Sequence, residues 1–143
     1  MPCPVCEKHK NLSAHTGPAI LEQDGWLVTH FPKSETETEK ATHGHLLIEP
    51  RRHIQDLSEM NEDEAQALGV LIREGAKRIC ERTSAEHVYC FRINDKVAHL
   101  HFHLIPRYPN TPKEFWGINI MACTTSPKLS TLDEIQVAAR DLL

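Results

Sequence analysis

The chain has 143 residues, of which 40% are hydrophobic and 25% are charged, and its formal net charge is −4 at pH 7. This composition is typical of one globular domain, placed here over residues 1–143, and it excludes broad electrostatic binding to nucleic acid, which needs clustered Lys and Arg. We find no signal-peptide core and no run of roughly 20 apolar residues that could span a bilayer, so we expect a soluble, cytoplasmic protein without membrane contact.

The cysteines favour metal or redox chemistry over disulfides. Their number, five, is odd, and the chain is not expected to be secreted, which argues against a disulfide framework. Cys3 and Cys6 form a close C-x-x-C pair, the spacing of metal and redox sites. We expect Cys80, Cys90 and Cys123 to be small buried hydrophobic side chains.

The first half of the chain predicts three strands. Residues 19–31, AILEQDGWLVTHF, predict a hairpin around the turn Asp24-Gly25. Residues 32–44 are polar and predict a solvated loop. Residues 45–50, HLLIEP, predict a strand that Pro50 ends, and RRHIQDLSEM predicts a turn with one short helical turn.

A long helix is predicted over residues 61–83, with Asn61 as N-cap and Glu64 completing a capping box. Apolar residues recur at helical spacing and predict the face that packs on the core. That face comprises Ala65, Leu68, Ile72, Ala76 and Ile79.

The second half predicts two antiparallel strands, residues 87–94 and 98–106, joined by Asp95-Lys96-Val97. We expect FWGINIMA, residues 115–122, to be extended, and a terminal helix to run from a Ser130/Thr131 cap to about Leu142. The order of elements predicts an α+β domain built on an antiparallel sheet, with one long helix and a C-terminal helix.

Three histidines alternate with apolar residues in HLHFHLI, residues 99–105. On a strand, His99, His101 and His103 would share one face, and Leu100 and Phe102 would share the buried face. Two kinds of chemistry fit this arrangement. Two of the histidines could bind a metal ion, or a neutral imidazole could act as a nucleophile or proton carrier toward phosphorus.

This segment resembles the H-φ-H-φ-H-φ-φ signature of the histidine triad (HIT) superfamily of nucleotide hydrolases and transferases, where φ is apolar. A second block, GHLLIEPRRH at residues 44–53, is similar to the family's G-H-x-L-[IV]-x-P-[KR]-x-H strand and turn. The resemblance implies the HIT fold, and it implies phosphoramidase or dinucleoside polyphosphate hydrolase chemistry at an α-phosphate. Sugar nucleotides are a further substrate class of the family, and none of these classes is selected by the sequence.

The resemblance also implies roles for individual residues. His101 would attack the α-phosphorus and form a covalent nucleotidyl-histidine, while the backbone carbonyl of His99 would hold the proton on the other ring nitrogen. His103 would donate a hydrogen bond to the phosphate oxygens, and His45 would orient the site.

As in several bacterial relatives, a structural zinc ion would be held by Cys3, Cys6, His53 and His99, although His9 or His45 could replace one ligand.

The sequence departs from the family at the loop before the triad, because it lacks the usual Gly-Gln-Ser/Thr end. Asn94 is expected to point to the active site, and Lys96 either supplies the missing phosphate contact or is a solvated turn residue. By analogy with the family we expect a homodimer formed through the long helix. A nucleotide-binding regulator without efficient catalysis and a His-ligated metalloenzyme of another class remain as alternatives.

Overall fold

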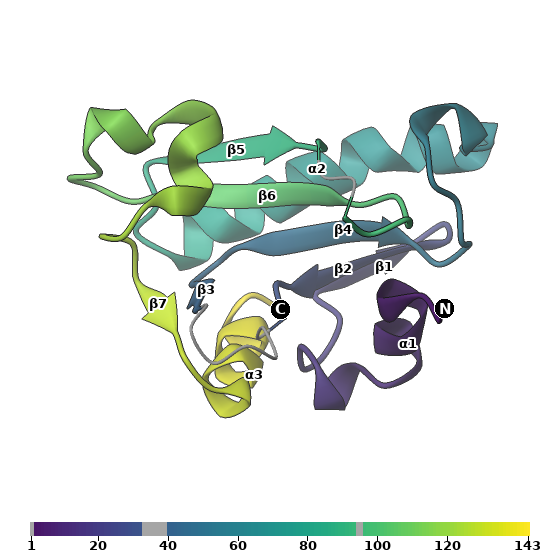
Figure 1. Ribbon diagram of the computed structural model, residues 1–143, viewed down its shortest axis with the longest axis horizontal. Coiled ribbons are helices and arrows are strands. Elements are labelled where there is room, and N and C mark those ends of the chain that lie inside the picture. Colours follow the sequence, from purple (N-terminus) through teal and green to yellow (C-terminus); the bar gives the residue numbers. More distant parts are fainter. Residues whose placement is uncertain (1, 33–39, 94–95) are drawn as a thin grey trace.

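The computed structural model describes residues 2–32, 40–93 and 96–143. Its main sheet has five antiparallel strands in the order β1-β2-β4-β6-β5, and a second sheet pairs β3 with β7 (Figure 1). The strands are β1 (Leu21–Gln23), β2 (Trp26–His30), β3 (Ala41–Thr42), β4 (Leu46–Pro50), β5 (His87–Phe91), β6 (Phe102–Arg107) and β7 (Lys128–Leu129), and the helices are α1 (Pro4–Lys10), α2 (Glu62–Arg82) and α3 (Leu132–Asp141). The predicted α+β class, with a long helix and a C-terminal helix, is confirmed. Within the described ranges, none of the helices is long and apolar enough to cross a membrane.

The predicted hairpin is present at β1 and β2. Asp24 and Gly25 both have positive φ angles, 49° and 83°, as a two-residue type I′ turn requires. This turn sets the register that pairs Gln23 with Trp26. The short helical turn expected after Pro50 is a 3₁₀ helix over Leu57–Glu59.

The long helix begins with the predicted capping box, in which Asn61 and Glu64 satisfy each other's backbone N–H groups. The predicted buried face was partly wrong. Of that face only Ile79 is buried, while Leu68, Ile72 and Ala76 are half-buried and Ala65 is exposed. The buried residues of α2 are Glu64, Ala67, Leu71, Gly75 and Ile79. The sheet packs tightly on Gly75, because a Cβ there would lie 2.6 Å from Leu104 Cδ1.

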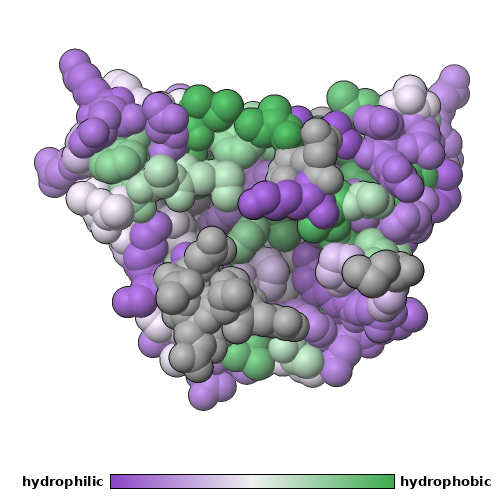
Figure 2. Space-filling view, in the orientation of Figure 1, coloured by the Kyte–Doolittle hydropathy of each residue, from purple (hydrophilic) through white to green (hydrophobic). Residues whose placement is uncertain are grey.

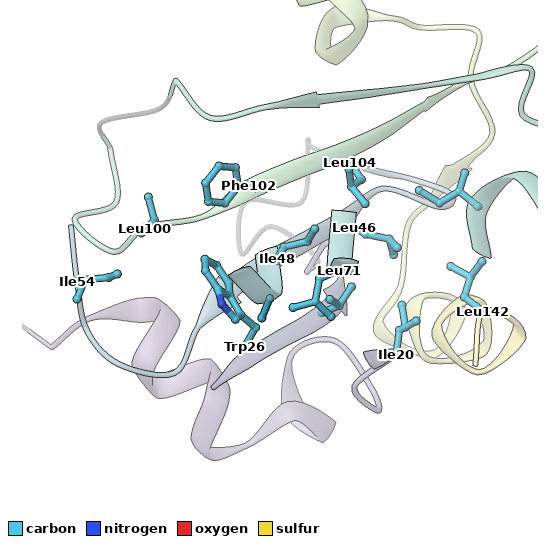
Figure 3. Packing of buried hydrophobic residues seen from close by; sticks show 13 residues of the cluster. Ile20, Trp26, Leu46, Ile48, Ile54, Leu71, Leu100, Phe102, Leu104 and Leu142 are labelled. Carbon is cyan, nitrogen blue, oxygen red and sulfur yellow. The ribbon is translucent and has the colours of Figure 1, made fainter. Parts of the chain in front are cut away.

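The main core lies between α2 and the sheet. Figure 3 shows Trp26, Leu46, Ile48 and Leu104 directed toward Leu71 of α2. Leu142, at the end of α3, closes the same cluster, and Arg78 Nη1 of α2 donates to its carbonyl oxygen at 3.0 Å.

The opposite face of the sheet is covered in part by a segment that was predicted to be extended. Residues 113–122 instead form two 3₁₀ helices, Lys113–Phe115 and Gly117–Ala122. Ile120 and Cys123 pack there on Ile105 of β6. Because this segment does not pair with a strand, its backbone groups are satisfied locally by short-range hydrogen bonds, such as Cys123 N–H to Ile120 O at 3.1 Å.

Other differences concern element ends and two cysteines. The expected loop over residues 32–44 contains strand β3, and its residues 33–39 lie outside the described part of the chain. Cys123 is buried as predicted, but Cys80 and Cys90 are exposed. Cys80 lies on the outer side of α2, and Cys90 lies on the edge strand β5, so neither position faces a packing partner in the sheet.

His30 is a buried histidine held in its neutral form. Its Nδ1–H donates to Phe31 O at 3.0 Å, and its Nε2 accepts from Gly44 N–H at 3.0 Å. A second ring proton would therefore meet an N–H group instead of an acceptor. Burial lowers the pKa of His30 to about 4.

The two glycines of α2 provide a matched test of the packing. Gly69→Ala meets no atom within 4 Å and should stabilise the protein by about 0.5–1 kcal/mol, because alanine favours the helix. Gly75→Val should destabilise it by about 1–3 kcal/mol through overpacking against Leu104. Urea denaturation monitored by circular dichroism measures both values, and a stabilising Gly75→Val would contradict the described contact.

His30 predicts a loss of stability in mild acid. Because its pKa falls from 6.5 in the unfolded chain to about 4 in the folded one, the unfolded state binds more protons between these values. Its contribution, on the order of 3 kcal/mol, should be complete above pH 6.5 and be lost as the pH falls toward 4.

His30→Gln can keep both hydrogen bonds and should flatten the dependence of unfolding free energy on pH between 6.5 and 4.5. His87→Gln, at an exposed position, is the control. If His30→Gln leaves the slope equal to that of the parent protein, the assignment of the slope to His30 is wrong.

Candidate active site

The three histidines of the predicted motif lie on the face of the sheet that points away from α2. His103 is in β6, whereas His99 and His101 precede the strand, which begins at Phe102 and not at residue 98 as predicted. Leu100, Phe102 and Leu104 point into the core from the other side (Figure 3). The alternation expected from the sequence therefore extends beyond the hydrogen-bonded strand.

The ring of His101 is fixed by its own backbone. Its Nδ1–H donates to the carbonyl oxygen of His99 at 2.7 Å, and within the described residues its Nε2 has no hydrogen-bond partner. A neutral imidazole with a proton on Nδ1 carries its lone pair on Nε2. The side chain is 7% exposed, and it lines a cavity of about 220 Å³.

His103 and His45 form a second pair beside His101. His45 Nε2 lies 2.8 Å from His103 Nδ1, and Phe31 stacks on the His45 ring at a centroid distance of 4.2 Å. Burial, and then neighbouring His101, lowers the pKa of His103 to about 4, and burial lowers the pKa of His45 well below its usual value. Both rings are therefore neutral at pH 7, and one proton is shared between the two facing nitrogens.

Two cavities meet at this face of the sheet. The smaller one holds His101 and His103 between walls that include Val5, Leu47 and Met121. The larger one, of about 480 Å³, lies on the other side of Phe31 and carries Lys40 and Lys128 together with His45. Figure 2 shows this face, with hydrophobic residues exposed in its centre and upper part and hydrophilic residues toward both sides.

A cluster that could hold a metal ion lies at one end of the site. Cys3, Cys6, His53 and His99 each offer one ligand atom, and these four atoms lie within 4.8 Å of one another. His99 Nδ1 is 3.5 Å from both sulfur atoms and 3.2 Å from His53 Nδ1. His99 Nε2–H donates to Pro50 O at 2.7 Å, which leaves Nδ1 unprotonated and directed at the cluster.

The two histidines considered as replacement ligands have other partners. His9 Nε2 lies 3.1 Å from Glu49 Oε1, and His45 bonds to His103. The C-x-x-C pair lies at the start of α1, a helix that the sequence analysis missed. Cys3 is its N-cap, Pro4 is its first residue, and the Cys6 N–H donates to Cys3 Sγ at 3.5 Å.

The same helix carries a charged residue into the smaller cavity. Lys8 Nζ lies 2.6 Å from Glu49 Oε1 of β4, and the two side chains are only 6% and 1% exposed. Burial alone would raise the pKa of Glu49, but the Lys8 charge and a hydrogen bond from His9 outweigh it and lower that pKa. Sequence reasoning missed both residues. The available signal was a glutamate in an otherwise apolar strand, at a position on the same face of the sheet as the histidines.

Two residues of the loop before the triad were expected to contact the substrate, and the structure describes only one of them. Lys96 is exposed in the bend that leads to His99, and its neighbour Val97 lines the smaller cavity. Asn94, which we expected to face the site, lies outside the described residues.

Comparisons with known proteins identify the family and the fold. The family model described as the HIT domain matches residues 27–110. A comparison with curated proteins finds no match. The solved structures with similar folds include the following three. A hypothetical histidine triad nucleotide-binding protein from Sulfolobus tokodaii has a TM-score of 0.69 at 16% identity, with 98% of this chain and 89% of that chain covered. A Zn-bound histidine triad family protein from Mycobacterium smegmatis has a TM-score of 0.64 at 19% identity, with 99% and 94% covered. A Hit-like protein involved in cell-cycle regulation from Bartonella henselae has a TM-score of 0.63 at 18% identity, with 87% and 82% covered.

The matched range covers more than half of the chain and includes both blocks of the motif, from Gly44 to His53 and from His99 to Ile105. The chain therefore belongs to the histidine triad (HIT) family.

Proposed function

We propose that this protein is a nucleotide hydrolase or transferase that cleaves a phosphoramidate or phosphoanhydride bond at the α-phosphate through a nucleotidyl-His101 intermediate. The hydrogen bond from His101 Nδ1–H to His99 O carries this proposal, because it leaves the lone pair on Nε2 of a ring that lines a cavity of about 220 Å³. The family is one of nucleotide-binding proteins and hydrolases, and one similar structure is named as nucleotide-binding.

In the proposed reaction, Nε2 forms a bond to the α-phosphorus while the bond to the leaving group breaks. The leaving group departs with the bonding electron pair and takes a proton from solvent, and the water that later attacks phosphorus returns a proton to solvent. The ring becomes cationic, and the His99 carbonyl oxygen stabilises the proton on Nδ1. Water then attacks phosphorus, the N–P bond breaks, and a nucleoside monophosphate is released.

His103 would stabilise the phosphate oxygens in both steps. A neutral His103 can donate from Nε2 only if its Nδ1 carries no proton, and a hydrogen bond donated by His45 Nε2–H to Nδ1 favours that tautomer. The stacked Phe31 ring holds His45 in that orientation. His45 is thus proposed as a positioning residue, and His103 as a group that touches the substrate.

We propose that the metal cluster binds one structural zinc ion. Tetrahedral zinc with bonds of about 2.3 Å to sulfur and 2.0–2.1 Å to nitrogen separates sulfur from nitrogen by about 3.6 Å and two nitrogens by about 3.3 Å. The corresponding separations in the cluster are 3.5–3.6 Å and 3.2 Å. With four protein ligands the site has no open position, so zinc would hold α1 and His99 in place and take no part in the reaction.

Three further expectations remain proposals. Asn94 would face the substrate, and Lys96 would supply a phosphate contact in place of the missing Gly-Gln-Ser/Thr loop. A homodimer would form through α2 and the neighbouring edge strand β5.

The shortened loop also favours a second candidate function, a nucleotide-binding regulator without efficient catalysis, which the adduct experiment below distinguishes.

The zinc proposal predicts one zinc ion per chain in protein purified without chelator. Cys3→Ser should remove most of the bound metal and lower the melting temperature, because the four ligands bind cooperatively. Mass spectrometry of the native protein and elemental analysis measure the stoichiometry. Cys80→Ser, at an exposed cysteine outside the cluster, should retain full zinc, and metal-free parent protein would refute the proposal.

The catalytic proposal predicts a covalent adduct on His101. Protein mixed with a nucleoside phosphoramidate or a dinucleoside polyphosphate and quenched in base should gain the mass of one nucleotidyl group, and peptide mapping should place it at His101. His101→Asn should form none, whereas His87→Asn on exposed β5 should behave as the parent.

His103→Ala should lower kcat by about 10²-fold to 10³-fold, the usual effect of removing one donor to developing charge. Nucleotide binding without adduct or turnover, across phosphoramidate, dinucleoside and sugar-nucleotide substrates, would instead support the regulator.

A further inference from the structure

The larger cavity adjoins the triad. It shares Phe31 and Met121 with the smaller cavity. It also contains His45, whose Nε2 lies 2.8 Å from His103 Nδ1. The smaller cavity, of about 220 Å³, is below the roughly 300–1,000 Å³ of sites for drug-sized ligands, whereas the larger one, of about 480 Å³, lies within that range. A substrate with its α-phosphate at the triad must therefore extend beyond the smaller cavity, and the larger cavity is an adjoining space that can receive it.

The small second sheet places an ammonium group in the wall of the larger cavity. Strand β7 pairs with β3, and Lys128 lies opposite Thr42 in this pairing (Figure 1). Lys128 Nζ donates to Thr42 Oγ1 at 2.9 Å, and both residues line the cavity. Because Thr42 is buried, this hydrogen bond holds the end of the lysine side chain at the cavity wall.

This ammonium group has no anionic side chain as an ion-pair partner in the part of the chain that the structure describes. No carboxylate there lies within ion-pair distance of Lys128, and none of the described lining residues is acidic. A second lysine, Lys40, lines the same cavity. Burial lowers the pKa of Lys128, although the neighbouring Cys123, when deprotonated, opposes this effect. An anionic ligand in the cavity would supply the missing negative charge.

The positive charge of the larger cavity distinguishes between the leaving groups of the proposed reaction. When the bond from the α-phosphorus to a bridging oxygen breaks, the oxygen keeps the bonding electron pair and leaves as part of a phosphate, which is anionic with or without an added proton. When a P–N bond breaks, the nitrogen keeps the electron pair, and the free amine takes protons from solvent and is a cation at neutral pH. Two lysines attract the first leaving group and repel the second.

We infer that the larger cavity binds the phosphate that follows the α-phosphate, and that Lys128 thereby selects substrates with a phosphoanhydride bond over phosphoramidates. Lys128 would donate to this second phosphate while Thr42 holds its side chain. Dinucleoside polyphosphates and sugar nucleotides share the required chemistry, because a phosphorylated group leaves in both. The inference rests on the proposed function for the placement of the α-phosphate at the triad.

Binding without turnover tests the inference. The probes are AMP and α,β-methylene-ADP, in which a carbon bridge that cannot be cleaved joins the two phosphates. Titration calorimetry should show that the second phosphate tightens binding by at least about tenfold, the usual effect of a hydrogen bond to a charged group.

Variants at position 128 assign this gain in affinity. Lys128→Met should lose the gain and bind AMP as the parent does, and Lys128→Gln, a second neutral variant with a polar end, should do the same. Lys128→Arg keeps the charge and should keep most of the gain. Lys77→Met, at an exposed position of α2, is the control and should keep all of it. Circular dichroism verifies that each variant is folded.

Turnover separates the two kinds of leaving group. Lys128→Met should lower kcat/KM at least about tenfold for diadenosine triphosphate or ADP-glucose, whichever the parent cleaves, and leave kcat/KM for adenosine 5′-phosphoramidate unchanged. Equal losses for the two kinds of substrate would overturn the inferred selectivity.

Equal affinities of the parent for AMP and α,β-methylene-ADP, or a gain that persists in the folded neutral variants, would overturn the inference. The outcomes also separate it from the catalytic proposal. A gain that depends on Lys128, without an adduct on His101, would leave the phosphate site standing and refute covalent catalysis. An adduct on His101 without the gain would do the reverse.

Discussion

The site depends on the hydrogen bonds that hold residues 99–101 against the end of β4. His99 Nε2–H donates to Pro50 O, Leu100 N–H donates to Ile54 O, and the carbonyl of His99 accepts from His101, each at 2.7 Å. The first two bonds therefore hold this short segment in place, and the third fixes the ring of His101 on it. Because the His99 carbonyl determines which nitrogen of His101 is protonated, a shift of this segment would change the chemistry of the ring.

His99 also belongs to the metal cluster, which links the triad to the N-terminal helix. Cys3 and Cys6 at the start of α1 meet His99 and His53, and Val5 and Lys8 of the same helix form part of the cavity wall. One helix of seven residues is too short to be stable alone. Its place beside the sheet relies on the cluster, on buried Val5 and on the contact of Lys8 with Glu49. A metal ion in the cluster would thus hold the cavity wall as well as the triad segment.

Where local patterns were strong, the sequence predicted structure well. Asp24-Gly25 specifies the hairpin turn, and Asn61 with Glu64 specifies the start of α2, because each device acts through neighbouring backbone groups. The errors have a different origin. Residues 115–122 were predicted to be extended, but they form 3₁₀ turns and pack beside Ile105, where they pair with no strand of the described sheet. Cys90 was wrongly predicted to be buried for a similar reason. It lies on β5, and the sequence does not show that β5 is the edge strand of the sheet.

The amino-acid sequence by itself determined the α+β class, the family and the set of histidines and cysteines that form the candidate site. Alternation along a strand and a family motif are properties of neighbouring residues, so they are visible without a fold. Only the tertiary structure decided that Lys8 meets Glu49, that His45 meets His103, and that Gly75 of α2 packs against Leu104. These contacts join residues 29 to 58 positions apart, and whether such residues meet depends on how the helices and strands pack together.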